Sequence, residues 1–199
     1  MSANMVAVLY LISALLFIFA LRGLSHPESS RLGNIFGIIG MVIAIITTLM
    51  FKSVLSYVEI GAAIIIGGAI GTFIALKIEM TALPQLVAAF HSLVGIAAVF
   101  VAAAAFYDPV AFNIGKVGSI KTASLVEMSI GTFIGAITFS GSVLAFGKLQ
   151  GTISGKPIVF KFQHLINAII FLIIIFLIVL FVINQSPSIF WTIVIISIL

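Results

Sequence analysis

One histidine lies inside a long apolar segment of the sequence. His91 follows Pro84 by seven residues. If the segment 84–107 is a helix that crosses a membrane, His91 lies about 10 Å inside it. An ionisable side chain is costly in hydrocarbon and by default marks an ion or proton path, and imidazole binds and releases a proton near neutral pH. His91 is therefore our candidate for proton translocation. The alternative is a neutral imidazole that bonds a neighbouring hydroxyl or carbonyl and fills the core of a helix bundle.

The segment 126–146 is unusually rich in hydroxyl side chains for a membrane helix. At helical spacing Thr132 and Ser140 share one face, and Thr138 and Ser142 share another. Hydroxyls on such faces can hold a chain of water molecules or bond to the histidine, which makes these four residues candidates for support of a proton path. Equally, hydroxylated and small residues are common in ordinary contacts between membrane helices.

Three acidic side chains stand close to the ends of apolar segments. Glu79 lies beside Lys77, just before the segment that carries His91. It is a candidate for the route between that histidine and the cytoplasm, and a surface ion pair with Lys77 is the simpler role. We expect Glu59 and Glu127 to cap the starts of their helices, where a carboxylate suits the positive end of the helix dipole.

The composition is that of a membrane protein, and it excludes several classes of function. Hydrophobic residues make up 63% of the chain and charged residues 7%, against about half and a quarter in soluble domains. The net charge of +4 is scattered over short loops and forms no basic stripe, so we expect no nucleic-acid partner. The absence of cysteine excludes thiolate catalysis and Cys-ligated metals. With no dinucleotide fingerprint, Walker lysine or ligand cluster, we expect no catalytic residue, no bound metal and no bound cofactor.

The apolar segments predict an all-α fold, a polytopic transmembrane helix bundle. Each segment is close to the roughly 20 residues that a spanning helix needs. Together they make residues 1–199 one membrane domain with no soluble nucleotide-binding domain. We expect six full spans and a partial seventh, at about residues 5–21, 35–51, 58–76, 84–107, 126–146, 165–183 and 189–199.

Basic residues predict the orientation in the membrane, since cytoplasmic loops carry an excess of Lys and Arg. Six basic residues fall on one side, namely Arg22, Arg31, Lys77, Lys148, Lys156 and Lys161, against Lys52, Lys116 and Lys121 on the other. The first side is therefore expected to be cytoplasmic and the amino terminus outside. GxxxG pairs, which favour close helix packing, occur at Gly33/Gly37, Gly67/Gly71 and Gly131/Gly135.

Several blocks of the sequence, taken in order, are similar to one known family. They are LGNIFG (32–37), IGGAIG (66–71), VAAFHSLVG (87–95), FIGAITFSGSV (133–143), AFGKL (145–149) and SGKP (154–157). Together they resemble the membrane domain of the beta subunit of the proton-translocating NAD(P) transhydrogenase. The similarity extends over nearly the whole chain.

The resemblance implies a function for the histidine. The family couples hydride transfer from NADH to NADP⁺, between two water-soluble nucleotide domains, to proton movement across the membrane. The family histidine that matches His91 is implicated in proton translocation. NAD(H) and NADP(H) would bind to partner domains, the partners would be the alpha subunit and an NADP-binding domain, and the complex would be a dimeric hetero-oligomer in the bacterial inner membrane.

The chain departs from the family pattern at its end. Family members continue through further spans into an NADP-binding domain, whereas this chain stops inside its expected seventh span, so the resemblance implies a truncated fragment that is inactive alone. The alternative function is a non-enzymatic channel, transporter or assembly subunit. A secondary transporter would be expected to show broken helices at corresponding positions of two halves, and an assembly subunit would not need His91.

Overall fold

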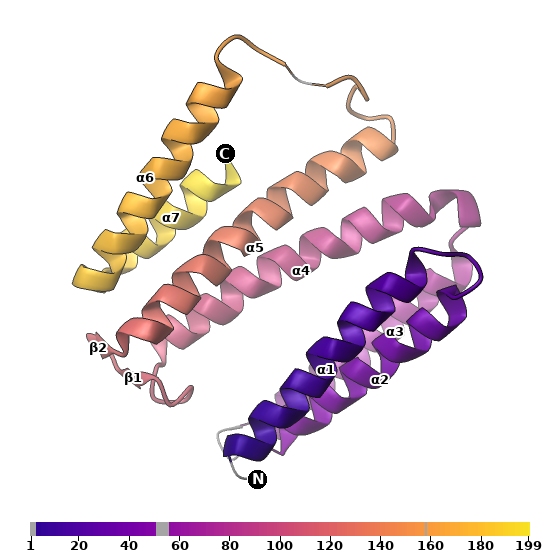
Figure 1. The fold of residues 1–199 in the computed structure, drawn as a ribbon, viewed down its shortest axis with the longest axis horizontal. Helices are drawn as coiled ribbons and strands as arrows, with labels where there is room; N and C mark the ends of the chain where they lie inside the picture. The colour runs from indigo at the N-terminus through magenta and orange to yellow at the C-terminus, as the bar shows by residue number, and fades with distance from the viewer. Residues whose placement is uncertain (1–2, 51–55, 158) are drawn as a thin grey trace. The chain divides into compact units, whose positions relative to one another are not determined.

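The structure, a computed structural model, describes residues 3–50, 56–157 and 159–199, and most of these are helical (Figure 1). The described helices are α1 (Ala3–Leu24), α2 (Ser30–Leu49), α3 (Tyr57–Lys77), the short 3₁₀ helix η1 (Met80–Ala82), α4 (Leu83–Tyr107), α5 (Thr122–Leu149), α6 (Gln163–Asn184) and α7 (Pro187–Ile198). Six of them are long and apolar enough to cross a membrane, and α7 is shorter. The predicted all-α membrane bundle is confirmed.

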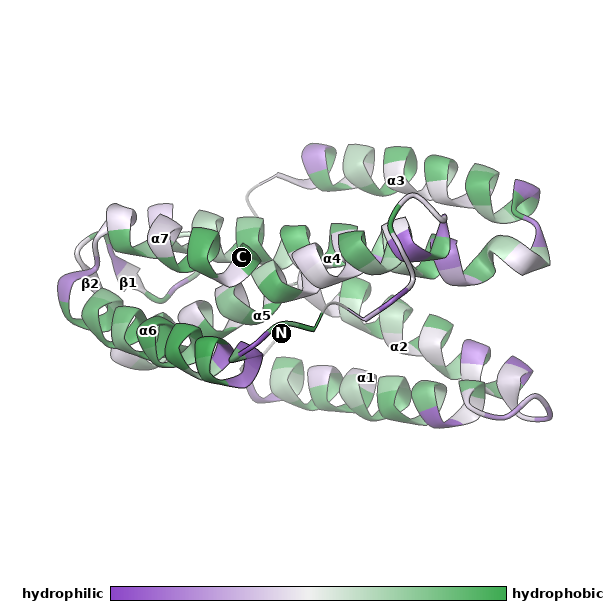
Figure 2. Ribbon diagram, turned by 90° about the horizontal axis from the view of Figure 1, so that it is seen from above, coloured by the Kyte–Doolittle hydropathy of each residue, from purple (hydrophilic) through white to green (hydrophobic). Residues whose placement is uncertain are grey.

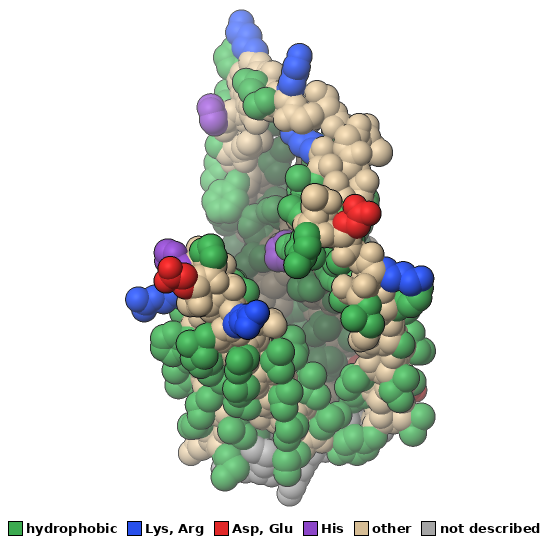
Figure 3. All heavy atoms as spheres, turned by 90° about the vertical axis from the view of Figure 1, so that its right-hand side faces the viewer, with side chains coloured by type: hydrophobic (Ala, Val, Ile, Leu, Met, Phe, Trp, Pro, Cys, Tyr) green, Lys and Arg blue, Asp and Glu red, His purple; other side chains and the backbone are tan. Residues whose placement is uncertain are grey.

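Polar and charged residues lie mainly at the ends of the helices, as the hydropathy colouring of Figure 2 shows. A small antiparallel ladder of β1 (Gly115–Lys116) and β2 (Ser119–Ile120) interrupts the connection from α4 to α5. In the space-filling view of Figure 3, hydrophobic side chains cover much of the visible surface, and charged side chains are sparse.

Several helices extend beyond the apolar segments that predict them. Helix α5 begins four residues before 126 and ends three residues after 146, and α2 begins at Ser30 instead of 35. Hydropathy marks the part of a helix that lies in lipid, whereas backbone hydrogen bonds continue into the polar interface. The predicted end of the second span at Phe51, and the basic residue Lys52, lie outside the described residues.

This difference overturns one of the two expected caps. Glu59 lies in the first turn of α3, as expected. Glu127 lies five residues after Thr122, the first residue of α5, whose first turn contains no acidic residue. The capping role expected for Glu127 is therefore wrong, because the helix starts before its apolar segment does.

The chain divides into two compact units, residues 1–67 and 68–199, with the boundary inside α3. In the first unit α1 and α2 form a helical hairpin whose backbones touch. A Cβ atom added at Gly23 would lie 2.6 Å from the Cα atom of Gly33, which leaves no room for a side chain. Further along, the Ser13 hydroxyl donates a 2.7 Å hydrogen bond to the carbonyl oxygen of Gly40.

In the second unit α4 and α5 form the main helix pair and run antiparallel (Figure 1). Their backbones meet at two glycines. A Cβ atom at Gly95 would lie 2.5 Å from the Phe139 nitrogen and 2.7 Å from the Gly135 carbonyl oxygen, and one at Gly135 would lie 2.8 Å from the Gly95 oxygen. Small residues permit this approach, which is how helices associate where lipid supplies no hydrophobic force.

The GxxxG pairs of the sequence contribute unequally to these contacts. Gly33 and Gly135 take part in the two backbone crossings, but each meets a glycine outside any GxxxG pair. A Cβ at Gly67, Gly71 or Gly131 would meet nothing within 4 Å. The motif therefore marks some of the glycines at helix crossings and does not identify their partners.

One side of the α4–α5 pair carries the apolar core of the second unit. Three aromatic rings, of Phe106, Phe181 and Phe190, lie with centroids 5.1 to 5.8 Å apart and join α4, α6 and α7. Beside them the Trp191 indole nitrogen donates a 3.1 Å hydrogen bond to the Tyr107 hydroxyl. Trp and Tyr favour the membrane interface, so this pair indicates where α4 and α7 leave the hydrocarbon.

The glycine crossing makes a prediction about stability. We expect Gly95→Ala to lower the free energy of unfolding by about 1–3 kcal/mol, the usual cost of overpacking, because the added methyl group meets backbone atoms. Gly131→Ala on α5 is the matched control, since its methyl group enters open space. The measurement is a denaturation curve in mixed micelles, followed by the fluorescence of Trp191, the single tryptophan. Equal stability of the two variants would contradict the crossing.

Candidate functional site

His91 lies in the interior of α4, eight residues after Leu83 and therefore about 12 Å along the helix. Pro84 lies in the first turn, where a backbone N–H would have no partner within the helix. Proline lacks that N–H and so suits the helix start. The imidazole is exposed, and within the part of the chain that the structure describes it makes no hydrogen bond or ion pair. The alternative of a bonded imidazole in the core therefore has no partner among these residues.

Two contacts between α4 and α5 determine which residues of α5 lie at the same height along the helix pair as His91. The first is the crossing of Gly95 with Gly135 and Phe139. The second lies at the start of α4, where the Gln85 amide nitrogen donates a 3.0 Å hydrogen bond to the Leu149 carbonyl oxygen. Between these contacts, the antiparallel register places His91 level with residues 141 and 142.

Helical geometry then sorts the candidate hydroxyls by side. At about 100° per residue, Ser142 lies about 20° and Thr138 about 60° from the direction of Gly135, which faces α4. On α4, His91 lies about 40° from the direction of Gly95. In a pair of antiparallel helices, two side chains that are rotated in the same sense around their own helices, away from the line of contact, lie on the same side of the pair. By this geometry Thr138, Ser142 and His91 lie on one side of the α4–α5 pair.

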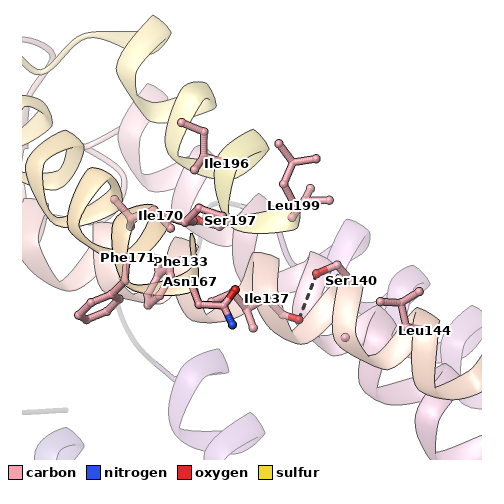
Figure 4. Close-up of a pocket in the computed structure, with 13 residues that line it drawn as sticks. Phe133, Ile137, Ser140, Leu144, Asn167, Ile170, Phe171, Ile196, Ser197 and Leu199 are labelled. Atoms are coloured by element: carbon pink, nitrogen blue, oxygen red, sulfur yellow. Dashed lines mark hydrogen bonds between the residues drawn. The ribbon is translucent and has the colours of Figure 1, made fainter. Parts of the chain in front are cut away.

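Ser140 lies on the other side of α5, about 160° around the helix from Ser142. It lines a cleft of about 400 Å³ between α5, α6 and α7, together with Asn167 and Ser197 (Figure 4). Its hydroxyl donates a long, 3.4 Å hydrogen bond to the Ile137 carbonyl oxygen of its own helix. The structure does not bring Ser140 to the side of His91.

Thr132 is fully buried, and its hydroxyl has no hydrogen-bond partner. It lies ten residues before Ser142, or about 15 Å along α5. Its neighbour Ser129, also buried, donates a 2.6 Å bond to the Leu125 carbonyl oxygen. Thr132 therefore belongs to the packed side of α5, away from the level of His91.

Glu79 lies directly before η1 and is exposed. The expected ion pair with Lys77 is not formed, although both residues are described. Instead the Lys77 ammonium group lies 4.2 Å from the centroid of the Phe73 ring, one turn back on α3. The structure shows no hydrogen bond between the Glu79 carboxylate and any described residue, so nothing fixes it near His91.

Two residues that the sequence reasoning missed, Gln85 and Gln150, stand on or beside this α4–α5 pair. Gln150 donates a 3.2 Å bond to the Gln85 side chain and completes a polar clamp where α4 begins and α5 ends. The signal available in the sequence was one glutamine at the start of the fourth predicted span and another shortly after the end of the fifth. Glu127 lines a groove of about 420 Å³ with small residues of α4, on the same side as His91. Its distance from the true helix start was not visible in the sequence.

Comparison with known proteins decides the family. A family model described as the NAD(P) transhydrogenase beta subunit matches residues 6–199. The chain belongs to this family. The chain is also 61% identical, over 164 residues, to the NAD(P) transhydrogenase subunit beta of Rhodospirillum rubrum, and equally so to that of the strain ATCC 11170. The match covers 82% of this chain and 35% of each relative, so the chain spans about a third of the length of the curated relatives it matches.

The arrangement of hydroxyls around the histidine of this transhydrogenase chain can be tested by cross-linking. The sequence has no cysteine, so pairs of cysteines can be introduced without background. We expect His91→Cys with Ser142→Cys to form a disulfide on mild oxidation, because the two positions are level and on one side of the pair. We expect His91→Cys with Ser140→Cys to form none, because residue 140 faces α6 and α7. Mobility on non-reducing gels is the measurement, and cross-linking of the second pair alone would contradict the register.

Proposed function

We propose that this chain forms the proton-conducting membrane part of an NAD(P) transhydrogenase. In this proposal hydride passes from NADH to NADP⁺ on partner domains, and the membrane part couples that transfer to proton translocation. Membership of the family and similarity to transhydrogenase beta subunits support the proposal. NAD(H) and NADP(H) bind to the partners, which are the alpha subunit and an NADP-binding domain, and the chain itself supplies no residue that touches the transferred hydride.

The observation that carries the proposal is the position of His91. It is the only His, Asp, Glu, Lys or Arg that lies more than two turns from either end of a described helix. Because such a group is costly in hydrocarbon, its presence there without a hydrogen-bond or ion-pair partner among the described residues favours a role in moving protons. The step is a reversible protonation, in which one imidazole nitrogen accepts a proton from one side of the membrane and the group later releases a proton to the other.

The neighbouring hydroxyls divide into two groups under this proposal. Thr138 and Ser142 share the side of His91, and they are the groups that support the path by bonding to the imidazole or to water. Thr132 is buried and serves packing, and Ser140 faces the cleft between α5, α6 and α7, away from His91. Glu79 stays a candidate for the inner end of the path, for which its exposure is the support.

We place the complex in the bacterial inner membrane as a dimeric hetero-oligomer, with the amino terminus of this chain outside. The excess of basic residues on one side of the predicted spans supports this orientation. Among the described residues, Lys148, Lys156 and Lys161 lie at the end of α5 and in its connection to α6, the side that the proposal makes cytoplasmic.

Replacement of the histidine tests the function. With residues 1–199 grafted into a complete transhydrogenase, we expect His91→Asn to reduce proton pumping driven by NADPH and NAD⁺ at least tenfold, because an amide does not titrate near neutral pH. Pumping is measured in membrane vesicles with a pH-sensitive dye, and assembly is measured by the amount of complex recovered.

The matched control is Leu93→Asn, which places the same amide two residues away on α4 at another exposed position. It should assemble and keep most of the pumping activity. Unchanged pumping by the His91→Asn complex, or equal loss in both variants, would make His91 a packing residue and remove the support for a proton path.

A further inference from the structure

The turn between α1 and α2 contains a small pocket that the proton path does not use. Its volume is about 420 Å³, and it is lined by Phe19, Arg22, Gly23, His26, Ser29 and Phe36. All six residues belong to the first unit, so the pocket is defined by the α1–α2 hairpin alone. We propose that it binds the phosphate group of an anionic phospholipid, a role independent of the proposed proton path.

The polar end of the pocket offers positive charge that no described residue neutralises. In the described part of the chain, neither the Arg22 guanidinium nor the His26 ring makes a hydrogen bond or ion pair. Both are exposed, and guanidinium and imidazole N–H groups are strong donors to phosphate oxygens. The one acidic residue of the turn, Glu28, does not line the pocket and forms no ion pair with Arg22 or His26.

The start of α2 adds to this positive end. Ser29, the N-cap residue, makes no side-chain bond to the first turn of the helix. Its hydroxyl instead donates a 2.8 Å bond backwards to the Gly23 carbonyl oxygen. The first backbone N–H groups of α2 therefore keep no side-chain acceptor, and the positive end of the helix dipole stands beside the pocket.

The opposite end of the pocket is apolar and lies deeper along the helices. Phe19 is one turn before Arg22 on α1, and Phe36 is about two turns into α2. Their ring centroids lie 6.1 Å apart. The pocket thus has a cationic end at the turn and an aromatic end toward the middle of two spanning helices, which matches the phosphate and the acyl chain of a lipid. Free phosphate would use only the first end.

The hairpin is tight enough to hold these groups in place. The backbones of Gly23 and Gly33 touch directly below the turn, and the bond from Ser29 to Gly23 closes it. A site on such a support loses little entropy when the lipid binds.

Lipid binding by the purified 199-residue chain provides the test. Native mass spectrometry, with phosphatidylglycerol titrated into the detergent-solubilised protein, gives the apparent affinity. We expect Arg22→Gln to weaken phosphatidylglycerol binding about fivefold, the effect of one juxtamembrane cation, and His26→Ala to weaken it at least about twofold. The matched control is Arg31→Gln, which removes the same charge from the second residue of α2 without touching the pocket; it should change binding less than twofold.

Three results would overturn the proposal. An equal loss with Arg31→Gln would show attraction to general surface charge. Equal binding of phosphatidylcholine would show that the anionic headgroup is not recognised, and displacement of the lipid by millimolar inorganic phosphate would identify a free-phosphate site. A far-ultraviolet circular dichroism melting curve of each variant, which follows helix content throughout the chain, ensures that only folded protein is compared. Because no step measures proton pumping, failure here leaves the proposed function unaffected.

Discussion

The contact of the α4 and α5 backbones at Gly95 and Gly135 governs the rest of the second unit. In lipid, apolar side chains gain little by meeting one another, because the acyl chains are as apolar as they are. A helix pair is therefore held by close backbone packing and by polar bonds, and here both act at once. The glycine crossing sets the distance, and the bonds of Gln85 to Leu149 and Gln150 set the register. The level of His91 against Ser142 follows from these two constraints and from nothing nearer to the histidine.

The hydroxyl groups of the chain show how polar atoms are accommodated in such an apolar structure. Most of those that are buried donate to a backbone carbonyl, either of their own helix, as Ser129 and Ser197 do, or of the next helix, as Ser13 does. These bonds need no partner outside the hairpin or helix that makes them. Thr132 is the exception among the described residues, since its buried hydroxyl has no partner. An unpaired buried hydroxyl costs about 1–3 kcal/mol, which the tight packing around it has to offset.

Much of the fold was accessible from the sequence, and the site only in part. Apolar segments of spanning length predict the helices, because lipid selects for them, but they misplace the helix ends, as Ser30 and Glu127 show. Helical spacing groups Thr138 with Ser142 and separates them from Ser140, which lines the cleft between α5, α6 and α7. It does not tell which group faces α4, because that depends on the position of Gly135 opposite Gly95. A GxxxG pattern describes one helix, whereas a close approach needs a small residue on both, so Gly23 and Gly95 were not recognised.

The uneven apolarity of the six long helices has a consequence for biogenesis. Helix α6 is the most apolar of them, whereas α5 is among the longest and the least apolar, because it carries the hydroxyls and glycines described above. A nascent α6 would leave the translocon for the bilayer unaided. For α5, insertion beside α4 is the easier route, because Gly95 of α4 and Gly135 of α5 let the two backbones pack closely. Membrane insertion of this region is thus expected to proceed by hairpins, with α4 retained beside the translocon until α5 arrives.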